Sequence, residues 1–194
     1  MFTTDHGEMM GNHSLWGKNG SLFEDVLRIP LVVSRKGQTE GRRINETVSS
    51  LEFFPTLLSF AGAYVDCDKC DGETLDTMVK KGGRDYIISE CDNRVAIIKD
   101  KIKLEINRIN LVTDKFFELY DLEKDPYEFE NRYSDPAYDD KKKELISILE
   151  NTPYLMETVF KEKYGADYWI NYGEGAGFSA NGEYEREGAR SKKG

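Results

Sequence analysis

The alternation of apolar and polar residues predicts a sheet in the middle of the chain. Residues 101–107 alternate charged and apolar side chains, which is typical of a strand with one buried face. Residues 85–90, 94–99 and 116–122 also read as short strands, and Asp100 with Lys101 could form a tight turn between two of them. Four short strands with turn-length connections predict an antiparallel meander.

Helical spacing of apolar residues predicts one helix before these strands in the sequence and one after them. Residues 48–62 place apolar side chains three and four positions apart, and Gly62 is a natural helix end. Residues 138–151 carry Leu145 and Leu149 on one face and a lysine run on the other, so an amphipathic helix is expected to lie across one face of the meander.

The first part of the chain has a different pattern. Residues 29–34 form a continuous apolar run, which predicts a buried strand, and a short helical turn is expected around residues 21–26. This strand and the helix of residues 48–62 make a strand–loop–helix unit, which is typical of an α/β layered fold.

Composition and charge narrow the classes of function. The 194 residues have a formal net charge of −9, from 27 basic and 36 acidic residues, so the chain is a poor candidate for binding a nucleic-acid backbone. No apolar run approaches the ~18–20 residues of a membrane span. The first residues lack the basic and apolar regions of a signal peptide. Beyond residue 173, Gly, Ser and charged residues dominate, and a loosely docked tail is expected.

The three cysteines do not predict a disulfide framework. Their number is odd, and Cys67-x-x-Cys70 is half of a zinc-ribbon pattern whose second half the sequence does not contain. The pair lies in an acidic, turn-rich stretch. An ordinary surface loop is the favoured interpretation, with a local disulfide or a partial metal site as alternatives.

Chemistry-bearing residues gather in the loop of residues 5–18. Asp5 and His6 follow a probable strand end, where α/β folds collect ligands, and an Asp–His pair can bind a divalent cation. His13 and Lys18 add one titratable group and one fixed cation, suited to a sulfate or phosphate oxygen. Both histidines of the chain lie in this loop. The alternative is an ordinary turn with a surface histidine and a solvated lysine. Glu8 fits a capping or supporting role better than direct ligation.

These residues also resemble a known motif. Residues 2–18, with Thr4-Asp5-His6-Gly7-Glu8 and Lys18, resemble the late active-site motif of type I sulfatases and phosphonate monoester hydrolases of the alkaline phosphatase superfamily. Residues 24–33, 48–62 and 118–128 resemble, in order, the following strand, the Leu-Phe-Pro-Thr-Leu-Leu helix and the Leu-Tyr-Asp-Leu-x-x-Asp-Pro signature of that family. The resemblance covers roughly residues 2–150.

The resemblance implies a fold and roles for the residues. The fold would be the C-terminal part of a sulfatase-type α/β sandwich, followed by a small antiparallel sheet with a packed helix. Asp5 and His6 would be metal ligands, for Ca²⁺ or, in the phosphonate hydrolase branch, Mn²⁺. Lys18 would contact the transferring group and the leaving-group oxygen, and His13 would lie near the same anion as a second catalytic residue. The cation and Lys18 would stabilise developing negative charge.

One part of the family pattern is missing. The family nucleophile is a formylglycine made from a Cys/Ser-x-Pro/Ala-x-Arg motif, and this sequence contains neither that motif nor the early Asp-Asp metal ligands. The expectation is a fragment of a sulfuric ester hydrolase, similar to arylsulfatases, that is inactive alone. Phosphonate monoester or phosphodiester hydrolases, phosphoglycerol transferases and a non-catalytic binding module are the alternatives.

The predicted organisation has three parts. Residues 1–80 would complete the catalytic α/β domain, residues 81–165 would form the antiparallel sheet with its helix, and residues 166–194 would be a tail. The expected partner is a small aryl or sugar sulfate, or a phosphonate ester, with no nucleic acid and no membrane span. The sequence leaves localisation and oligomeric state open.

Overall fold

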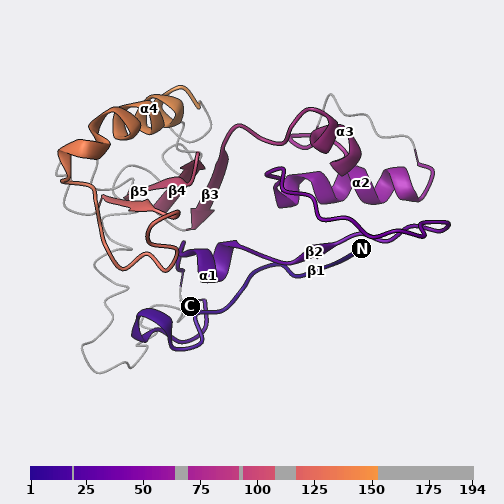
Figure 1. Cartoon of the computed structure of the whole chain (residues 1–194), viewed down its shortest axis with the longest axis horizontal. Coiled ribbons are helices and arrows are strands. Elements are labelled where there is room, and N and C mark those ends of the chain that lie inside the picture. Colours follow the sequence, from indigo (N-terminus) through magenta and orange to yellow (C-terminus); the bar gives the residue numbers. More distant parts are fainter. Residues whose placement is uncertain (19, 64–69, 92–93, 108–116, 153–194) are drawn as a thin grey trace, which may run out of the picture. The chain divides into compact units, whose positions relative to one another are not determined.

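The computed structural model describes residues 1–18, 20–63, 70–91, 94–107 and 117–152 (Figure 1). The chain divides into two compact units, Met1–Leu145 and Ile146–Gly194, and each is considered by itself. Both sheets lie in the first unit. In the second unit the described residues are 146–152, which complete the last helix. The predicted boundaries near residues 80 and 165 stay predictions.

The predicted antiparallel meander is confirmed. Its strands pair in sequence order: β3 (Ile87–Cys91), β4 (Arg94–Lys99), β5 (Ile102–Asn107) and β6 (Glu118–Asp121). The expected tight turn joins β4 to β5, because Asp100 and Lys101 have φ of 51° and 65°. Positive φ at both central residues matches the twist of the flanking strands.

One face of this sheet is apolar. Leu104 stands opposite Ile97 in the register, and both side chains are fully buried. Helix α4 (Asp139–Glu150) lies on this side, since Lys99 alternates onto the same face as Ile97 and pairs with Glu144 at 3.7 Å. The prediction of an amphipathic helix across the sheet is therefore confirmed for the part of α4 within the first unit.

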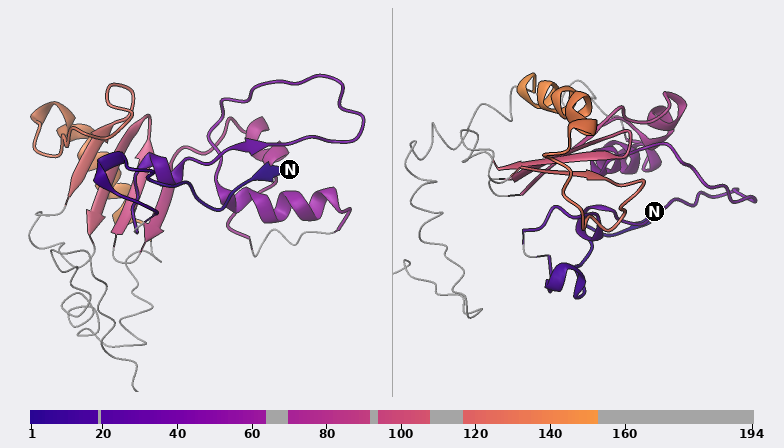
Figure 2. Two further views of the ribbon diagram at one scale, coloured as in Figure 1. Left: turned by 90° about the horizontal axis from the view of Figure 1, so that it is seen from below. Right: turned by 60° about the vertical axis from the view of Figure 1, so that its left-hand side comes forward.

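The opposite face of the sheet buries charged residues in pairs. Lys103 is fully buried, and its Nζ pairs with Glu128 and donates to the Leu22 carbonyl oxygen. Glu105 on the same strand pairs with Arg94, and burial raises the pKa of the Glu105 carboxyl. Figure 2 shows the sheet nearly edge-on with the N-terminal ribbon along this face. Residues near position 22 are thus tied to the sheet.

The N-terminal strands are shorter than the sequence suggests. β1 (Phe2–Thr3) pairs with β2 (Leu31–Val32) in a two-stranded antiparallel sheet. The prediction of a buried strand at residues 29–34 is wrong in extent and in burial, because Val32 is 58% exposed. No third strand pairs with β1 or β2 among the described residues, so this apolar run has no cover there. The expected helical turn is present as α1 (Glu24–Leu27).

The helix predicted for residues 48–62 is confirmed with a kinked start. The 3₁₀ turn η2 (Ser50–Glu52) leads into α2 (Phe53–Phe60). Ser49 and Glu52 form a reciprocal capping box that satisfies backbone donors at this start. Gly62 follows the helix with φ of 69°, the left-handed conformation that commonly ends helices.

A further helix, α3 (Leu75–Lys80), was not predicted. Thr74 caps it by accepting from the Thr77 amide, and the Thr56 hydroxyl of α2 accepts from the Leu75 amide at 2.8 Å. None of the described helices has the length and apolar character needed to cross a membrane. Cys67 and the predicted tail lie outside the described residues.

Candidate functional site

The loop after β1 is fixed by one close backbone approach. Gly7 donates its amide to the Val26 carbonyl at 2.8 Å. A Cβ at position 7 would lie 2.0 Å from the Asp25 carbonyl oxygen, a distance that no side chain can occupy. Gly7 is therefore needed for contact with α1, which places Asp5 and His6 at a set position beside that helix.

Asp5 and His6 place two side chains that could bind a cation side by side, with Asp5 exposed and His6 partly buried. Asp5 Oδ2 lies 3.6 Å from His6 Nε2, and the Asp5 side chain is 83% exposed. Hydrogen bonds from its own backbone amide, from the His6 amide and from the Thr4 hydroxyl hold the pKa of Asp5 below its usual value. Asp5 thus presents an ionised carboxylate at neutral pH.

The tautomer of His6 follows from its neighbours. Nδ1 lies 2.8 Å from the Gly7 carbonyl oxygen, which can only accept, so Nδ1 carries the hydrogen. Nε2 is then an acceptor, and Lys18 Nζ donates to it at 3.2 Å. Glu8 lies on the Nδ1 side, 3.8 Å away, which is a position for supporting the ring and not for sharing a ligand with Nε2.

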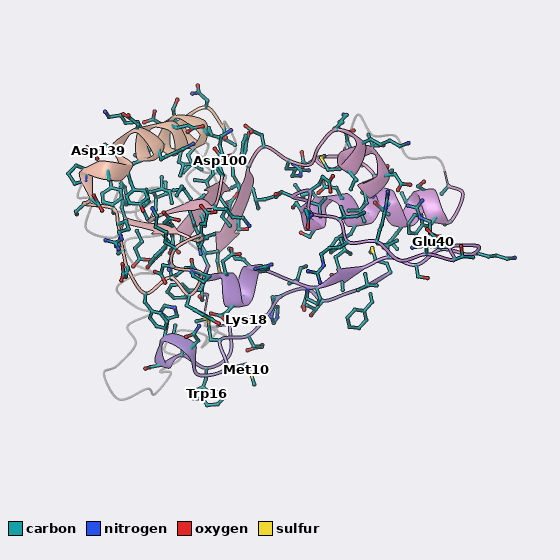
Figure 3. The ribbon with its side chains drawn as sticks, in the orientation of Figure 1. Met10, Trp16, Lys18, Glu40, Asp100 and Asp139 are labelled. Carbon is teal, nitrogen blue, oxygen red and sulfur yellow. The ribbon has the colours of Figure 1, made fainter. Side chains whose placement is uncertain are left out.

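The structure therefore brings Asp5, His6 and Lys18 together. Figure 3 shows Lys18 on the loop from which the exposed Met10 and Trp16 side chains extend outward. The loop closes on itself through Met9, whose amide donates to the Gly17 carbonyl at 3.1 Å and whose side chain is buried.

His13 makes its contacts elsewhere. Its Nε2 donates to the Tyr127 carbonyl oxygen at 2.8 Å, and its ring stacks between Phe23 and Phe129 at centroid distances of 4.0 and 4.7 Å. No hydrogen bond joins His13 to Asp5, His6 or Lys18, all of which belong to the described part of the chain. A direct catalytic role for His13 stays a prediction.

The Asp5–His6 pair has suitable geometry for two ligands of one cation. Ligand atoms lie about 2.0–2.6 Å from a divalent ion, so two neighbouring ligands are roughly 3–3.7 Å apart. The 3.6 Å between Asp5 Oδ2 and His6 Nε2 fits this range. The described residues contain no cluster of three or more such side chains.

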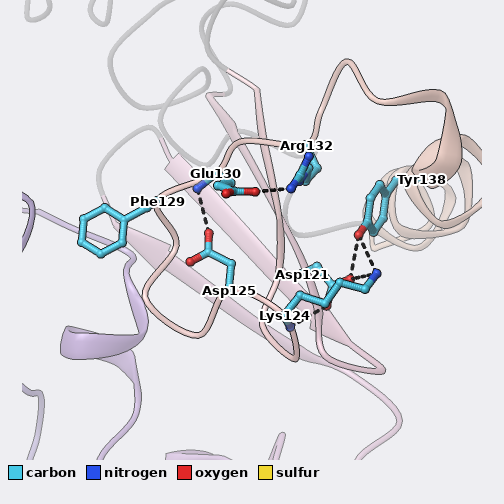
Figure 4. Close-up of a pocket in the computed structure, with 7 residues that line it drawn as sticks. All are labelled: Asp121, Lys124, Asp125, Phe129, Glu130, Arg132 and Tyr138. Atoms are coloured by element: carbon cyan, nitrogen blue, oxygen red, sulfur yellow. Dashed lines mark hydrogen bonds and ion pairs between the residues drawn. The ribbon is translucent and has the colours of Figure 1, made fainter.

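A hollow lies beside β6 and is lined by paired charges (Figure 4). It has a volume of about 230 Å³. Lys124 and the Tyr138 hydroxyl both donate to Asp121 Oδ2, at 2.8 and 2.7 Å, and Arg132 pairs with Glu130. These cations already have carboxylate partners, so the geometry favours a structural role for this hollow over an anion site.

Comparison with known proteins identifies the family. The model of the family described as "N-sulphoglucosamine sulphohydrolase, C-terminal" matches residues 11–153, well over half of the chain. The chain belongs to the sulfatase family. This assignment confirms the resemblance to sulfatases of the alkaline phosphatase superfamily. The matched residues include His13 and Lys18 but begin after Asp5 and His6, whose metal-binding role stays a prediction.

Curated relatives agree with this membership. This sulfatase-family chain is 32% identical over 161 residues to the "uncharacterized sulfatase YidJ" of Escherichia coli (strain K12), covering 77% of this chain and 31% of that protein. It is 34% identical over 159 residues to the "multifunctional alkaline phosphatase superfamily protein PehA" of Trinickia caryophylli, with coverage of 71% and 30%. The chain spans about a third of the length of these relatives.

Solved structures confirm the predicted fold class. The phosphonate monoester hydrolase of Agrobacterium radiobacter has a TM-score of 0.64 and 28% identity, over 77% of this chain and 33% of that one. A protein solved in complex with its substrate D-glucosamine-2-N,6-O-disulfate has a TM-score of 0.61 at 24% identity, over 79% and 33%, which shows the fold alone.

Sequence reasoning missed the residues that hold the loop in place. Phe23 and Phe129 stack on His13, and Lys103 and Glu128 bind the backbone of residues 22 and 24. The signature of residues 118–128 indicates that this segment is characteristic of the family. A sequence motif does not indicate which loop the segment contacts in the folded chain.

Proposed function

We propose that this chain is the C-terminal part of a sulfuric ester hydrolase that works with a bound divalent cation. Asp5 and His6 would be two of the cation ligands, and Lys18 would bind the sulfuryl group. The observation that carries the proposal is the shared geometry of these three side chains: an ionised Asp5, a His6 ring whose Nε2 is an acceptor, and a cationic Lys18 within 3.2 Å of it.

The chemistry assigned to each residue follows from this geometry. A bound cation would supply positive charge where negative charge develops on the ester oxygens. Because that cation would use the Nε2 lone pair of His6, Lys18 would turn its ammonium from His6 toward a sulfuryl or leaving-group oxygen. Lys18 is exposed and can make this change by side-chain rotation. A fixed ammonium at that point stabilises the departing oxygen.

The nucleophile is proposed to lie outside this sequence. The sequence contains no Cys/Ser-x-Pro/Ala-x-Arg motif, from which sulfatases of the resembled type make formylglycine. The curated relatives are about three times as long as the matched region. We therefore expect the 194-residue chain alone to release no product from 4-nitrophenyl sulfate.

The proposed substrate class is a small aryl or sugar sulfate. Relatives of this chain are named arylsulfatase, in Clostridium perfringens, and N-acetylglucosamine-6-O-sulfatase, in Bacteroides thetaiotaomicron. A phosphonate or phosphate ester is the second candidate, favoured by the likeness to the phosphonate monoester hydrolase of Agrobacterium radiobacter. Turnover of 4-nitrophenyl sulfate against phenyl phosphonate by the full-length enzyme would separate the two classes.

Cation binding can be tested on this chain directly. Mn²⁺ added in substoichiometric amounts should broaden the ring proton signals of His6 before those of His13, because only His6 would ligate the ion. Asp5→Asn should weaken this selective broadening, whereas Asp140→Asn, at a fully exposed carboxylate, should not. Equal broadening of both histidines, or none at millimolar Mn²⁺, would refute the assignment of Asp5 and His6.

The role of Lys18 requires turnover in the full-length enzyme. Lys18→Ala should lower kcat on an aryl sulfate by roughly 10²–10³-fold, the usual effect of removing one electrostatic stabiliser, with metal content unchanged. Lys143→Ala is the control, since Lys143 lies on α4, is 77% exposed and pairs with the fully exposed Asp140 at 3.9 Å. Unchanged turnover in Lys18→Ala would remove Lys18 from the mechanism.

A further inference from the structure

The loop that carries Lys18 has little packing of its own. Between the buried Met9 and the buried Ser21, none of the described residues is buried. His13 and Ser14 also adopt left-handed backbone conformations, with φ of 51° and 60°. Such conformations are disfavoured for residues other than glycine and persist when the surroundings hold them in place. Backbone hydrogen bonds within the loop and contacts from outside it, including Asn12 with Asp25 of α1, supply that hold.

Three consecutive residues after β6, residues 127–129, supply the outside contacts that hold His13. The Tyr127 carbonyl oxygen accepts from His13 Nε2, and the Phe129 ring covers one face of the imidazole while Phe23 covers the other. Figure 4 shows the Phe129 ring directed away from the other residues of that hollow. His13 is thus held by one hydrogen bond and two stacked rings.

Glu128, which lies between Tyr127 and Phe129, anchors the far end of the loop. Glu128 is buried, with φ of 59°, and its Oε2 accepts from the Glu24 amide at 2.7 Å. Its Oε1 pairs with Lys103, which also donates to the Leu22 carbonyl oxygen. Both carboxylate oxygens of Glu128 therefore hold backbone or side-chain donors close to residues 22–24.

We propose that residues 127–129 form a positioning strap for the loop that carries Lys18. His13 is the loop's attachment point to this strap and acts on the chemistry only through the placement of Lys18. The proposal rests on the role of Lys18 in the proposed function and gives the family signature of residues 118–128 a physical task. None of the strap residues is assigned a contact with substrate.

The two histidines of the chain make the proposal testable by NMR on the full 194-residue chain. Ring currents from Phe23 and Phe129 should shift the His13 ring protons upfield of those of His6. A nuclear Overhauser effect should connect the Lys18 Hε protons with the His6 ring, given the 3.2 Å between Nζ and Nε2. Amide hydrogen exchange of residues 11–18 reports the order of the loop.

Phe129→Leu keeps an apolar side chain but removes the stacked ring. It should reduce the upfield shift of His13, raise amide exchange in residues 11–18 by roughly threefold to tenfold, and weaken the Lys18–His6 Overhauser effect. Phe129→Tyr should restore all three readouts, because the ring is kept. Phe54→Leu is the matched control, since Phe54 and Phe129 are 61% and 64% exposed and Phe54 lies on α2.

Two results would contradict the proposal that residues 127–129 position the loop. If Phe129→Leu changed the His13 shift but left loop exchange and the Lys18–His6 contact as they were, the stacking would not position Lys18. If Phe129→Tyr, which keeps the ring, behaved like Phe129→Leu, ring stacking would not be what holds the loop. The Mn²⁺ experiment separates this failure from failure of the proposed function: selective broadening of His6 depends on Asp5 and His6 and should persist in Phe129→Leu.

Discussion

The four-stranded sheet and the α2 segment differ in where their apolar side chains lie. Ile97 and Leu104 in the sheet are fully buried, whereas Phe54 and Leu57 on α2 are 61% and 49% exposed. The strand pair β1–β2 is similar to α2, with Phe2 67% exposed. Apolar side chains of comparable size thus have opposite environments in two regions of one chain.

This difference shows which region is complete within the described residues. The sheet has an apolar face against α4, and on its other face the buried Lys103 and Glu105 pair with Glu128 and Arg94. Among the described residues, no element covers the apolar surface of α2 to a comparable extent. Because apolar burial supplies most of the driving force for folding, the sheet should account for most of the stability of this chain.

The buried ion pair of the sheet should give the largest effect. Lys103→Met removes the cation and leaves Glu128 charged and buried, which should cost about 3–5 kcal/mol of unfolding free energy. Urea unfolding followed by circular dichroism measures this loss. Adding Glu128→Gln should recover part of it, because the unpaired charge is then gone. A loss below about 1 kcal/mol would mean that the pair is not desolvated.

The same substitution in both regions tests the comparison directly. Leu104→Ala, at a fully buried position, should cost about 2–5 kcal/mol, whereas Leu57→Ala, at a position 49% exposed, should cost well under half of that. Both values come from the same urea titrations. Equal costs would show that Leu57 is covered in solution, and the contrast between the two regions would fail.

Gly7 tests whether the site loop depends on its contact with α1. Gly7→Ala would place a Cβ against the Asp25 carbonyl oxygen and should cost about 1–3 kcal/mol, with loss of the selective broadening of His6 by Mn²⁺. Gly41→Ala is the control, because a Cβ there meets nothing within 4 Å. Normal His6 broadening in Gly7→Ala would show that the loop can form without this approach.

The smallest expected effect is a change in folding stability at acid pH. Hydrogen bonds from Lys124 and Tyr138 lower the pKa of Asp121 from 3.8 to about 2. A carboxyl with a depressed folded-state pKa adds stability that is present above its unfolded pKa and is lost as the pH falls through its folded pKa. The contribution of Asp121 should therefore disappear between about pH 4 and pH 2. Asp121→Asn should flatten the acid limb of a stability–pH curve over that interval, and an unchanged limb would argue against the shift.

The sheet could be predicted from the sequence because its signals are local. Alternation in residues 101–107 and the turn at Asp100 depend on neighbouring residues, and β5 and that turn appear where expected. The apolar run of residues 29–34 was misread because burial depends on what covers a strand, which a local pattern does not contain. α3 was missed because it spans only six residues, too few for clear helical periodicity.

For the candidate site, the sequence predicted the proximity of three loop residues but not the contacts of the fourth, and the roles of all four stay predictions. Asp5, His6 and Lys18 were grouped from their spacing and from the resemblance, and the structure places them in contact. His13 was grouped with them on the same grounds, yet its partner Tyr127 is 114 positions away. Contacts across such a separation follow from the tertiary fold, and no pattern within the loop indicates them.

The two-stranded sheet also has a consequence for how the protein behaves as a solute. Among the described residues, β1 and β2 are both edge strands, and Phe2 and Val32 on them are exposed, so two copies of this 194-residue chain could join edge to edge. The net charge of −9 opposes such contact through mutual repulsion. Salt screens that repulsion beyond about 8 Å at physiological ionic strength. Light scattering should therefore rise with salt as well as with protein concentration, and dilute low-salt buffers should keep the molecules apart.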